Sequence, residues 1–360
     1  MRGKVSIIVG GHYGDEGKGK IISYLALHDR PTIVARAGVG PNAGHSVYYR
    51  GKKYGLRMIP CGFIAEQAKL YIGAGTLVDP ERFLKEVEMT GTKSRVWIDK
   101  RCAIIEEKHK REDRVGKANE IGTTGSGCGP ANAARVNRIA KQARDIPELE
   151  QYLADVPLEI NKAIDGGEDI LVEASQGFGL SLYYGNYPYV TSKDTTASSA
   201  CADLGIGPTN VSDVIVVFKA YMSRVGRDPY INYLSDEEIK KSPIWSRILK
   251  EAEENKVQGK TAQEKIAYYF DEKGTVTGRP RKIAEFDYQL AHYALKVNGA
   301  TQVALTCLDK LFPECRGARE LKELSSSAKN FVENMEKKIG HRITLISTGP
   351  NPEEIIDLRC

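Results

Sequence analysis

The chain has 360 residues, of which 41% are apolar, 8% aromatic and 28% charged. That composition can supply a full hydrophobic core, and it excludes a disordered or fibrous protein. The net charge of +5 is scattered along the chain, so we expect no nucleic-acid partner. No apolar run approaches the ~20 residues of a membrane span, and no signal-peptide core follows the first residues. We therefore expect no membrane partner and a cytoplasmic location, in the host cytoplasm if the source is viral.

Short β-branched runs alternate with helical patterns along the whole chain. Runs of this kind are typical of buried parallel strands joined by crossover helices. We therefore predict an α/β fold, with one large domain over residues 1–360 and a central, mostly parallel sheet. The expected strands are residues 5–9, 32–35, 70–72, 170–173, 213–219, 302–306 and 342–347.

Residues 235–273 differ from the rest because they are strongly charged and rich in helix formers. Ser235 with Glu238, and Thr261 with Glu264, fit the capping box that opens a helix. We predict a charged helical insertion within the domain.

A glycine-rich segment, residues 10–20, follows the first expected strand and precedes an amphipathic run. Backbone N–H groups in such a turn converge on phosphate oxygens, and Lys18 adds positive charge. Gly19 stands where the ordinary P-loop has a magnesium-binding Ser or Thr, so Asp15 is the carboxylate available for Mg²⁺. The segment predicts a P-loop-like nucleotide site; the alternative is a turn whose acid and lysines only face water.

A second dense loop, residues 38–46, contains His45 among small residues. A histidine that a ligand can approach closely can act as an acid or hydrogen-bond donor near neutral pH. The loop alone leaves a catalytic and a structural role for His45 equally open.

Eight further motifs follow in order along the chain: IGTTG at 121–125, GPA at 129–131, QG at 176–177, YPYVTS at 187–192, SRVG at 223–226, TVTGR at 275–279, TCLD at 306–309 and STGP at 347–350. With the two loops, they resemble the adenylosuccinate synthetases, and the compact length resembles the short archaeal-type branch. The resemblance implies a carbon–nitrogen ligase of purine biosynthesis. GTP would phosphorylate O6 of a 6-oxopurine nucleotide, and L-aspartate would then displace phosphate from C6, leaving GDP and phosphate as products.

The resemblance also implies roles for individual residues. Asp15 would be the base at purine N1 and, with the Gly44 carbonyl, a Mg²⁺ ligand; His45 and Lys18 would stabilise the transferring phosphoryl group. GTP would be bound by Glu16, Gly17, Lys18, Gly19, Lys20, Asp309, Ser347, Gly349 and Pro350. The acceptor nucleotide would be bound by Asn42, Thr124, Gln176, Thr191, Val225 and, reaching across a homodimer into the partner's site, Arg138. Aspartate would be bound by Thr275, Thr277 and Arg279. Asp309 favours GTP because a carboxylate can accept from both N1–H and N2–H of guanine.

The chain departs from the family's pattern near the acceptor's ribose. Residues 227–233 replace the usual Gly-Pro-Phe-Pro-Thr-Glu stretch, and Ala174 replaces a glycine two residues before the base-facing Gln176. We therefore expect the same reaction on dGMP, as in the phage offshoot of the family that makes N6-succino-2-amino-2′-deoxyadenylate for 2-aminoadenine DNA. Many members of the offshoot lack the acid that this chain retains as Asp15, and this retention counts against dGMP as the acceptor. The alternative acceptor is IMP, giving adenylosuccinate, and a remote alternative is a non-catalytic GTP-binding regulator.

Overall fold

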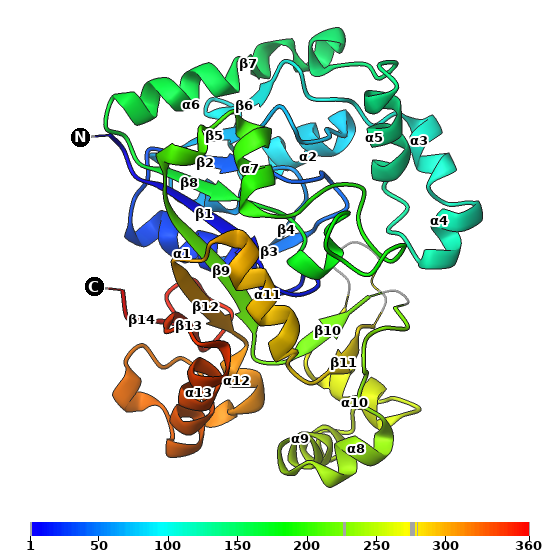
Figure 1. Cartoon of the computed structure of the whole chain (residues 1–360), viewed down its shortest axis with the longest axis vertical. Coiled ribbons are helices and arrows are strands. Elements are labelled where there is room, and N and C mark those ends of the chain that lie inside the picture. Colours follow the sequence, from blue (N-terminus) through cyan, green and yellow to red (C-terminus); the bar gives the residue numbers. More distant parts are fainter. Residues whose placement is uncertain (1, 226–227, 274–277, 279, 360) are drawn as a thin grey trace.

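The computed structural model describes residues 2–225, 228–273, 278 and 280–359, with the backbone only at 117–119. A ten-stranded sheet runs through the molecule in the order β14-β13-β12-β9-β1-β8-β2-β5-β6-β7 (Figure 1). All neighbouring strands pair in parallel except β13 and β14. The bounds are β1 Val5–Gly10, β2 Ile33–Arg36, β5 Lys69–Ile72, β6 Val96–Asp99, β7 Leu153–Ala154, β8 Ile170–Glu173, β9 Val211–Lys219, β12 Gln302–Thr306, β13 Ile343–Ser347 and β14 Ile355–Asp357.

This sheet confirms the predicted α/β fold. All seven expected strands belong to it, whereas β6, β7 and β14 were missed. Two antiparallel pairs lie outside it: β3 His45–Tyr49 with β4 Lys52–Leu56, and β10 Met222–Arg224 with β11 Lys282–Ala284. The α-helices are α1 Lys18–His28, α2 Pro80–Thr90, α3 Glu107–Glu112, α4 Gly116–Ile121, α5 Cys128–Val136, α6 Val156–Asp165, α7 Ala197–Leu204, α8 Asp236–Lys241, α9 Pro243–Glu254, α10 Ala262–Tyr269, α11 Tyr288–Asn298, α12 Leu308–Leu311 and α13 Ser326–Ile339. Short 3₁₀ turns are Cys61–Ile64, Ala143–Asp145, Pro147–Tyr152, Phe178–Leu180, Pro208–Asn210, Pro313–Cys315 and Leu321–Glu323.

Both faces of the sheet are buried. Ile7 of β1 packs into one hydrophobic cluster with Leu295 of α11, and the next residue, Ile8, packs into another with Ile21 of α1. Successive strand side chains point to opposite faces, so α11 and α1 cover opposite sides of the sheet. This double burial explains why the strands read as continuous apolar runs. No helix in the described part of the chain has the length and apolar content needed to cross a membrane.

Helices α8, α9 and α10 are grouped at one end of the molecule, beside β10 and β11 (Figure 1). Ser235 and Glu238 form the expected capping box, whereas Thr261 caps the Glu264 amide while the Glu264 side chain accepts from the Lys260 amide. Trp245 belongs to the main core cluster, so these helices are packed onto the sheet domain. That residues 235–273 are an insertion stays a prediction.

Candidate active site

The loop between β1 and α1 is held in shape by a buried ion pair. Glu16 accepts hydrogen bonds from the backbone N–H groups of His12 (3.0 Å) and Gly14 (2.8 Å). Its second oxygen lies 2.8 Å from the Lys18 ammonium, and both side chains are only 1% exposed. Gly17, at φ 79°, adopts the left-handed conformation that lets the chain enter α1. The predicted loop therefore exists, and Glu16 supports it from within.

Asp15 lies in the same loop, and a lysine ammonium contacts one of its carboxylate oxygens. The Lys219 ammonium lies 2.8 Å from Asp15 Oδ2, and the Ser223 hydroxyl also bonds that oxygen. Arg281 Nη1 lies 3.6 Å from it. One oxygen of Asp15 is thus held by the protein, which orients the other, Oδ1, for a ligand.

His45 begins β3 and is buried against a carboxylate. Its Nδ1 contacts Glu173 Oε1 and lies 2.8 Å from Arg36 Nη1. Burial, and then the neighbouring Arg36 charge, lower the pKa of His45 to about 4, so the ring is neutral at neutral pH. Its Nε2 is buried and has no hydrogen-bond partner among the described residues. This nitrogen is the atom of His45 that remains for a ligand.

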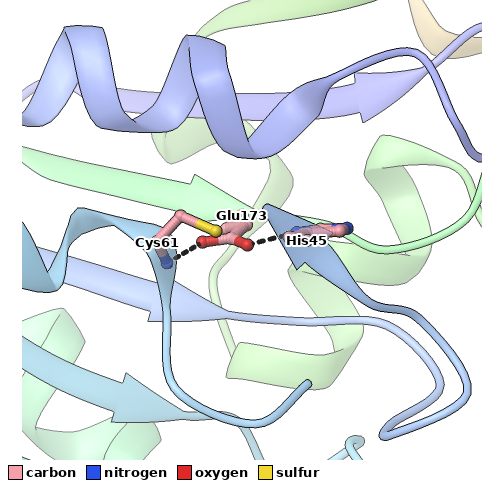
Figure 2. Close-up of side chains that lie close together, drawn as sticks. All are labelled: His45, Cys61 and Glu173. Atoms are coloured by element: carbon pink, nitrogen blue, oxygen red, sulfur yellow. Dashed lines mark hydrogen bonds and ion pairs between the residues drawn. The ribbon is translucent and has the colours of Figure 1, made fainter. Parts of the chain in front are cut away.

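His45, Cys61 and Glu173 bring potential metal-ligand atoms within 4.8 Å of one another (Figure 2). Burial acts to raise the pKa of Glu173, but Arg36 and His45 outweigh it and lower the pKa to about 2. The Glu173 carboxylate is therefore ionised and already paired with the Arg36 guanidinium, while burial raises the pKa of the Cys61 thiol well above its usual value. This arrangement orients His45 and does not suit a metal ion.

A cavity of about 310 Å³ opens beside these groups. Its walls hold Asp15 and His45 together with Arg281. Nearly all the residues that the resemblance assigns to GTP also line it: Gly17, Lys18, Gly19, Lys20, Asp309, Ser347, Gly349 and Pro350. The C-terminal ends of β1, β12 and β13 thus meet at one site, as expected for a parallel sheet.

Lys20 joins two walls of this cavity. Its ammonium donates to the backbone carbonyls of Gly349 (2.8 Å), Asn351 and Glu354 (3.3 Å). Lys20 therefore fixes the 347–354 segment to the glycine-rich loop. Asp309 lies opposite in the first turn of α12, where burial raises the pKa of its carboxyl group.

Three of the residues expected to bind the acceptor form a hydrogen-bonded group. Gln176 donates to Asn42 Oδ1 (2.9 Å), and Asn42 donates to the Thr191 hydroxyl (3.1 Å). Thr124, the fourth, bonds the Ser126 hydroxyl at 2.8 Å. Tertiary structure thus brings together chain segments that are far apart in the sequence.

The remaining assigned residues are Val225, Arg138 and three that lie outside the described residues. Val225 follows β10 at a bend and is half-buried. Arg138 follows α5 and is exposed. Thr275, Thr277 and Arg279, the residues expected to bind aspartate, lie outside the described residues.

Comparison with known proteins identifies the family. The model of the adenylosuccinate synthetase family matches residues 7–151 and 141–315. The adenylosuccinate synthetase of Archaeoglobus fulgidus is 54% identical over 356 residues, which cover 98% of each chain. That of Methanocaldococcus jannaschii is 55% identical over 359 residues, covering 98% of this chain and 96% of its own. The chain belongs to the adenylosuccinate synthetase family. It is therefore a ligase that forms carbon–nitrogen bonds.

Two solved structures share the fold. A fully ligated adenylosuccinate synthetase from Plasmodium falciparum is 23% identical, with a TM-score of 0.85 over 99% of this chain and 100% of its own. The cyanophage S-2L succinoaminodeoxyadenylate synthetase, solved with dGMP and with dATP as an energy donor, is also 23% identical. Its TM-score is 0.75 over 100% of this chain and 97% of its own. At these identities the likeness establishes the fold of the adenylosuccinate synthetases and nothing finer.

Ala174, one of the departures from the family pattern, directly follows β8. It is 3% exposed and belongs to a hydrophobic core cluster. The neighbouring Ser175 bonds Gln176 Oε1 at 2.6 Å and so orients that side chain.

Several residues of the synthetase site were missed by the sequence analysis. Lys219, Glu272 and Arg36 carry buried charge beside Asp15 or His45. A charged residue that ends an apolar run, as Arg36 and Lys219 do, is a signal that could have indicated these two residues.

Proposed function

We propose that this chain is a GTP-dependent ligase that joins L-aspartate to C6 of IMP, through a 6-phosphoryl intermediate, and forms adenylosuccinate. The observation that carries the proposal is the single cavity that has Asp15, His45 and the 347–350 segment in its walls. The Archaeoglobus and Methanocaldococcus relatives, both named adenylosuccinate synthetase, support the same reaction and favour IMP as the acceptor.

Asp15 is the proposed base. O6 of the purine becomes nucleophilic only as N1 loses its proton, and a positioned base contributes roughly 10²–10⁴ in rate. Lys219 and Ser223 hold Asp15 Oδ2, so Oδ1 is the oxygen proposed to face the reactant. One carboxylate oxygen, Oδ2, thus orients Asp15, and the other, Oδ1, would accept the proton.

His45 is the proposed donor to the transferring phosphoryl group. The negative charge of a phosphate at Nε2 favours the protonated ring, which then donates through both nitrogens. Glu173 is placed to accept from Nδ1. Lys18 adds positive charge at the same wall of the cavity, since phosphoryl transfer depends mainly on positioning and charge stabilisation.

Mg²⁺ and GTP are the proposed cofactor and phosphoryl donor. The Asp15 carboxylate and the Gly44 backbone line one cavity, and hard oxygen donors of this kind fit Mg²⁺. When bound, the ion would neutralise charge on the phosphate oxygens. Asp309 is proposed to accept from the guanine edge, and the Ser347–Pro350 segment to close over the base.

A second candidate acceptor is dGMP, which the sequence analysis favours. Part of the replaced stretch is buried: Asp228 is 2% exposed and accepts from Arg224 Nη1 at 2.6 Å. Arg224 also donates to the Tyr189 carbonyl at 2.6 Å, close in sequence to Thr191. A change here can alter the ribose side of the acceptor site, because a polar group left facing a missing 2′-hydroxyl costs about 1–3 kcal/mol. The names of the relatives nevertheless lead us to rank IMP first.

We also propose a homodimer in which Arg138 reaches the partner's site. Val136 and Ile139, on either side of Arg138, are 77% and 72% exposed. Apolar side chains exposed beside a guanidinium suit a subunit interface. The cytoplasmic location stays a prediction.

The test is phosphate release from GTP with Mg²⁺ and L-aspartate, supplying IMP, dIMP, GMP and dGMP in turn and identifying products by mass. Consumption of IMP with formation of adenylosuccinate is the expected result. Consumption of dGMP alone would replace IMP by the second candidate. Tight GTP binding by calorimetry without phosphate release from any mixture would instead indicate a non-catalytic regulator.

A further inference from the structure

A cluster of buried charges stands behind Asp15. Lys219, at the end of β9, is 2% exposed, and Glu272, just beyond α10, is 5% exposed. The Lys219 ammonium lies 2.8 Å from Asp15 Oδ2 and 2.9 Å from Glu272 Oε1. Charges this deeply buried require partners of opposite sign. Lys219 pairs with both Glu272 and Asp15, so a change of charge at Glu272 alters how Lys219 holds Asp15.

Glu272 is the centre of this cluster. Its Oε2 lies 2.8 Å from Arg281 Nη1 and 3.0 Å from the Ser223 hydroxyl, while the Tyr221 hydroxyl donates to Oε1. Burial would raise the pKa of Glu272, but Lys219 and Arg281 outweigh it and hold the pKa below its usual range. The ionised Glu272 balances two cations that would otherwise both depend on Asp15.

Glu272 also holds the stem of the segment that contains Thr275 and Thr277. The Arg281 amide donates to the Glu272 carbonyl at 3.0 Å, and Lys273 and Pro280 form an isolated bridge next to it. The described residues on either side of this segment, Lys273 and Pro280, thus lie next to residues tied to Glu272. One side chain connects this stem with the cation that orients Asp15.

We propose that Glu272 is a positioning residue for the ligation, which fixes Lys219 against Asp15 and holds Arg281 at the stem of the segment to which the resemblance assigns aspartate binding. The inference rests on the proposed function, because that function assigns Asp15 as the base, and on the resemblance, which assigns Thr275, Thr277 and Arg279 to aspartate. Glu272 touches no reactant. Its effect passes through Lys219, Arg281 and the stem.

The test is Glu272→Gln, which keeps the shape and removes the charge. We expect kcat to fall at least about tenfold and the KM for aspartate to rise, with the KM for GTP within about twofold. Glu272→Asp, which keeps the charge, should recover part of kcat. The matched control is Glu285→Gln: Glu285 accepts from Trp245 Nε1 at 2.7 Å, and a neutral amide can still do so. It should leave all three parameters unchanged.

A folded Glu272→Gln enzyme with wild-type kcat and aspartate KM would overturn the proposal, as would parallel changes in the KM of all substrates. If Glu272→Gln does not fold, the double variant Glu272→Gln/Lys219→Met removes one charge of each sign. It should fold and remain slow, and full activity in that variant would also overturn the proposal. The wild-type protein is assayed alongside. Absence of wild-type turnover refutes the proposed function, whereas wild-type turnover with an unaffected variant refutes only this inference.

Discussion

The buried pair of Arg36 and Glu173 predicts a large effect from a small substitution. Glu173→Gln keeps the side-chain shape but removes the charge that faces a guanidinium only 1% exposed. Breaking one partner of a buried ion pair typically costs about 3–5 kcal/mol, because the remaining charge stays in the interior. For a chain of 360 residues, we expect the melting temperature to fall by roughly 4–7 °C.

The same substitution tests how His45 is oriented. The carboxylate meets Arg36 and His45 at Oε1 and accepts from the Cys61 amide at Oε2, so a glutamine would set its NH₂ group against one of these donors and disturb the arrangement around His45. We expect kcat to fall roughly 10- to 100-fold, a part of the 10²–10⁴ that a well-placed acid or donor supplies. The KM for GTP should change little, since Glu173 lies behind the histidine.

Thermal unfolding by circular dichroism and steady-state phosphate release measure the two effects. Glu81→Gln is the control, because Glu81 pairs with Lys85 on an exposed helix face, where both side chains are about 70% exposed. Exposed ion pairs contribute little to the free energy of unfolding, so this variant should match the wild type in both assays. If Glu173→Gln also matches the wild type, the buried pair neither stabilises the fold nor orients His45, and the reasoning fails.

Four further predictions concern single residues of the site. Asp15→Asn should keep GTP binding by calorimetry and lose turnover, and more than about a tenth of the wild-type rate would contradict its role as base. Mixing inactive Arg138→Ala with inactive Asp15→Asn should restore activity through hybrid dimers, and no recovery despite proven subunit exchange would exclude the shared site. Because burial lowers the pKa of Lys20 to about 8, the tie to the 347–354 segment should weaken at higher pH. The KM for GTP should then rise between about pH 7 and pH 9, a rise that Lys20→Met should lack. Asp309→Asn should lower kcat/KM for GTP at least about tenfold without a comparable loss for ITP, which lacks the 2-amino group. An equal loss with both nucleotides would contradict guanine reading by Asp309.

The sequence by itself determined the main strands, the glycine-rich loop and several helix starts. Each of these is a local pattern: β1 and β9 are rich in β-branched residues, and Ser235 with Glu238 caps a helix within four residues. Strand β7 has two residues, which is too short for a periodic signal, and the three residues of β14 and four of β6 were also missed. The resemblance of its motifs to those of the adenylosuccinate synthetases also indicated the family and many of the residues around the cavity.

Only the tertiary structure decided which charges meet. Arg36 and Glu173 are 137 positions apart, and Lys219 lies 204 positions from Asp15. They become neighbours because β8 lies between β1 and β2, while β9 flanks β1 on its other side. Strand order depends on packing across the whole sheet, and no local pattern contains it. The partners of a buried charge follow from that order, so the groups that orient Asp15 and His45 could not be inferred from the sequence.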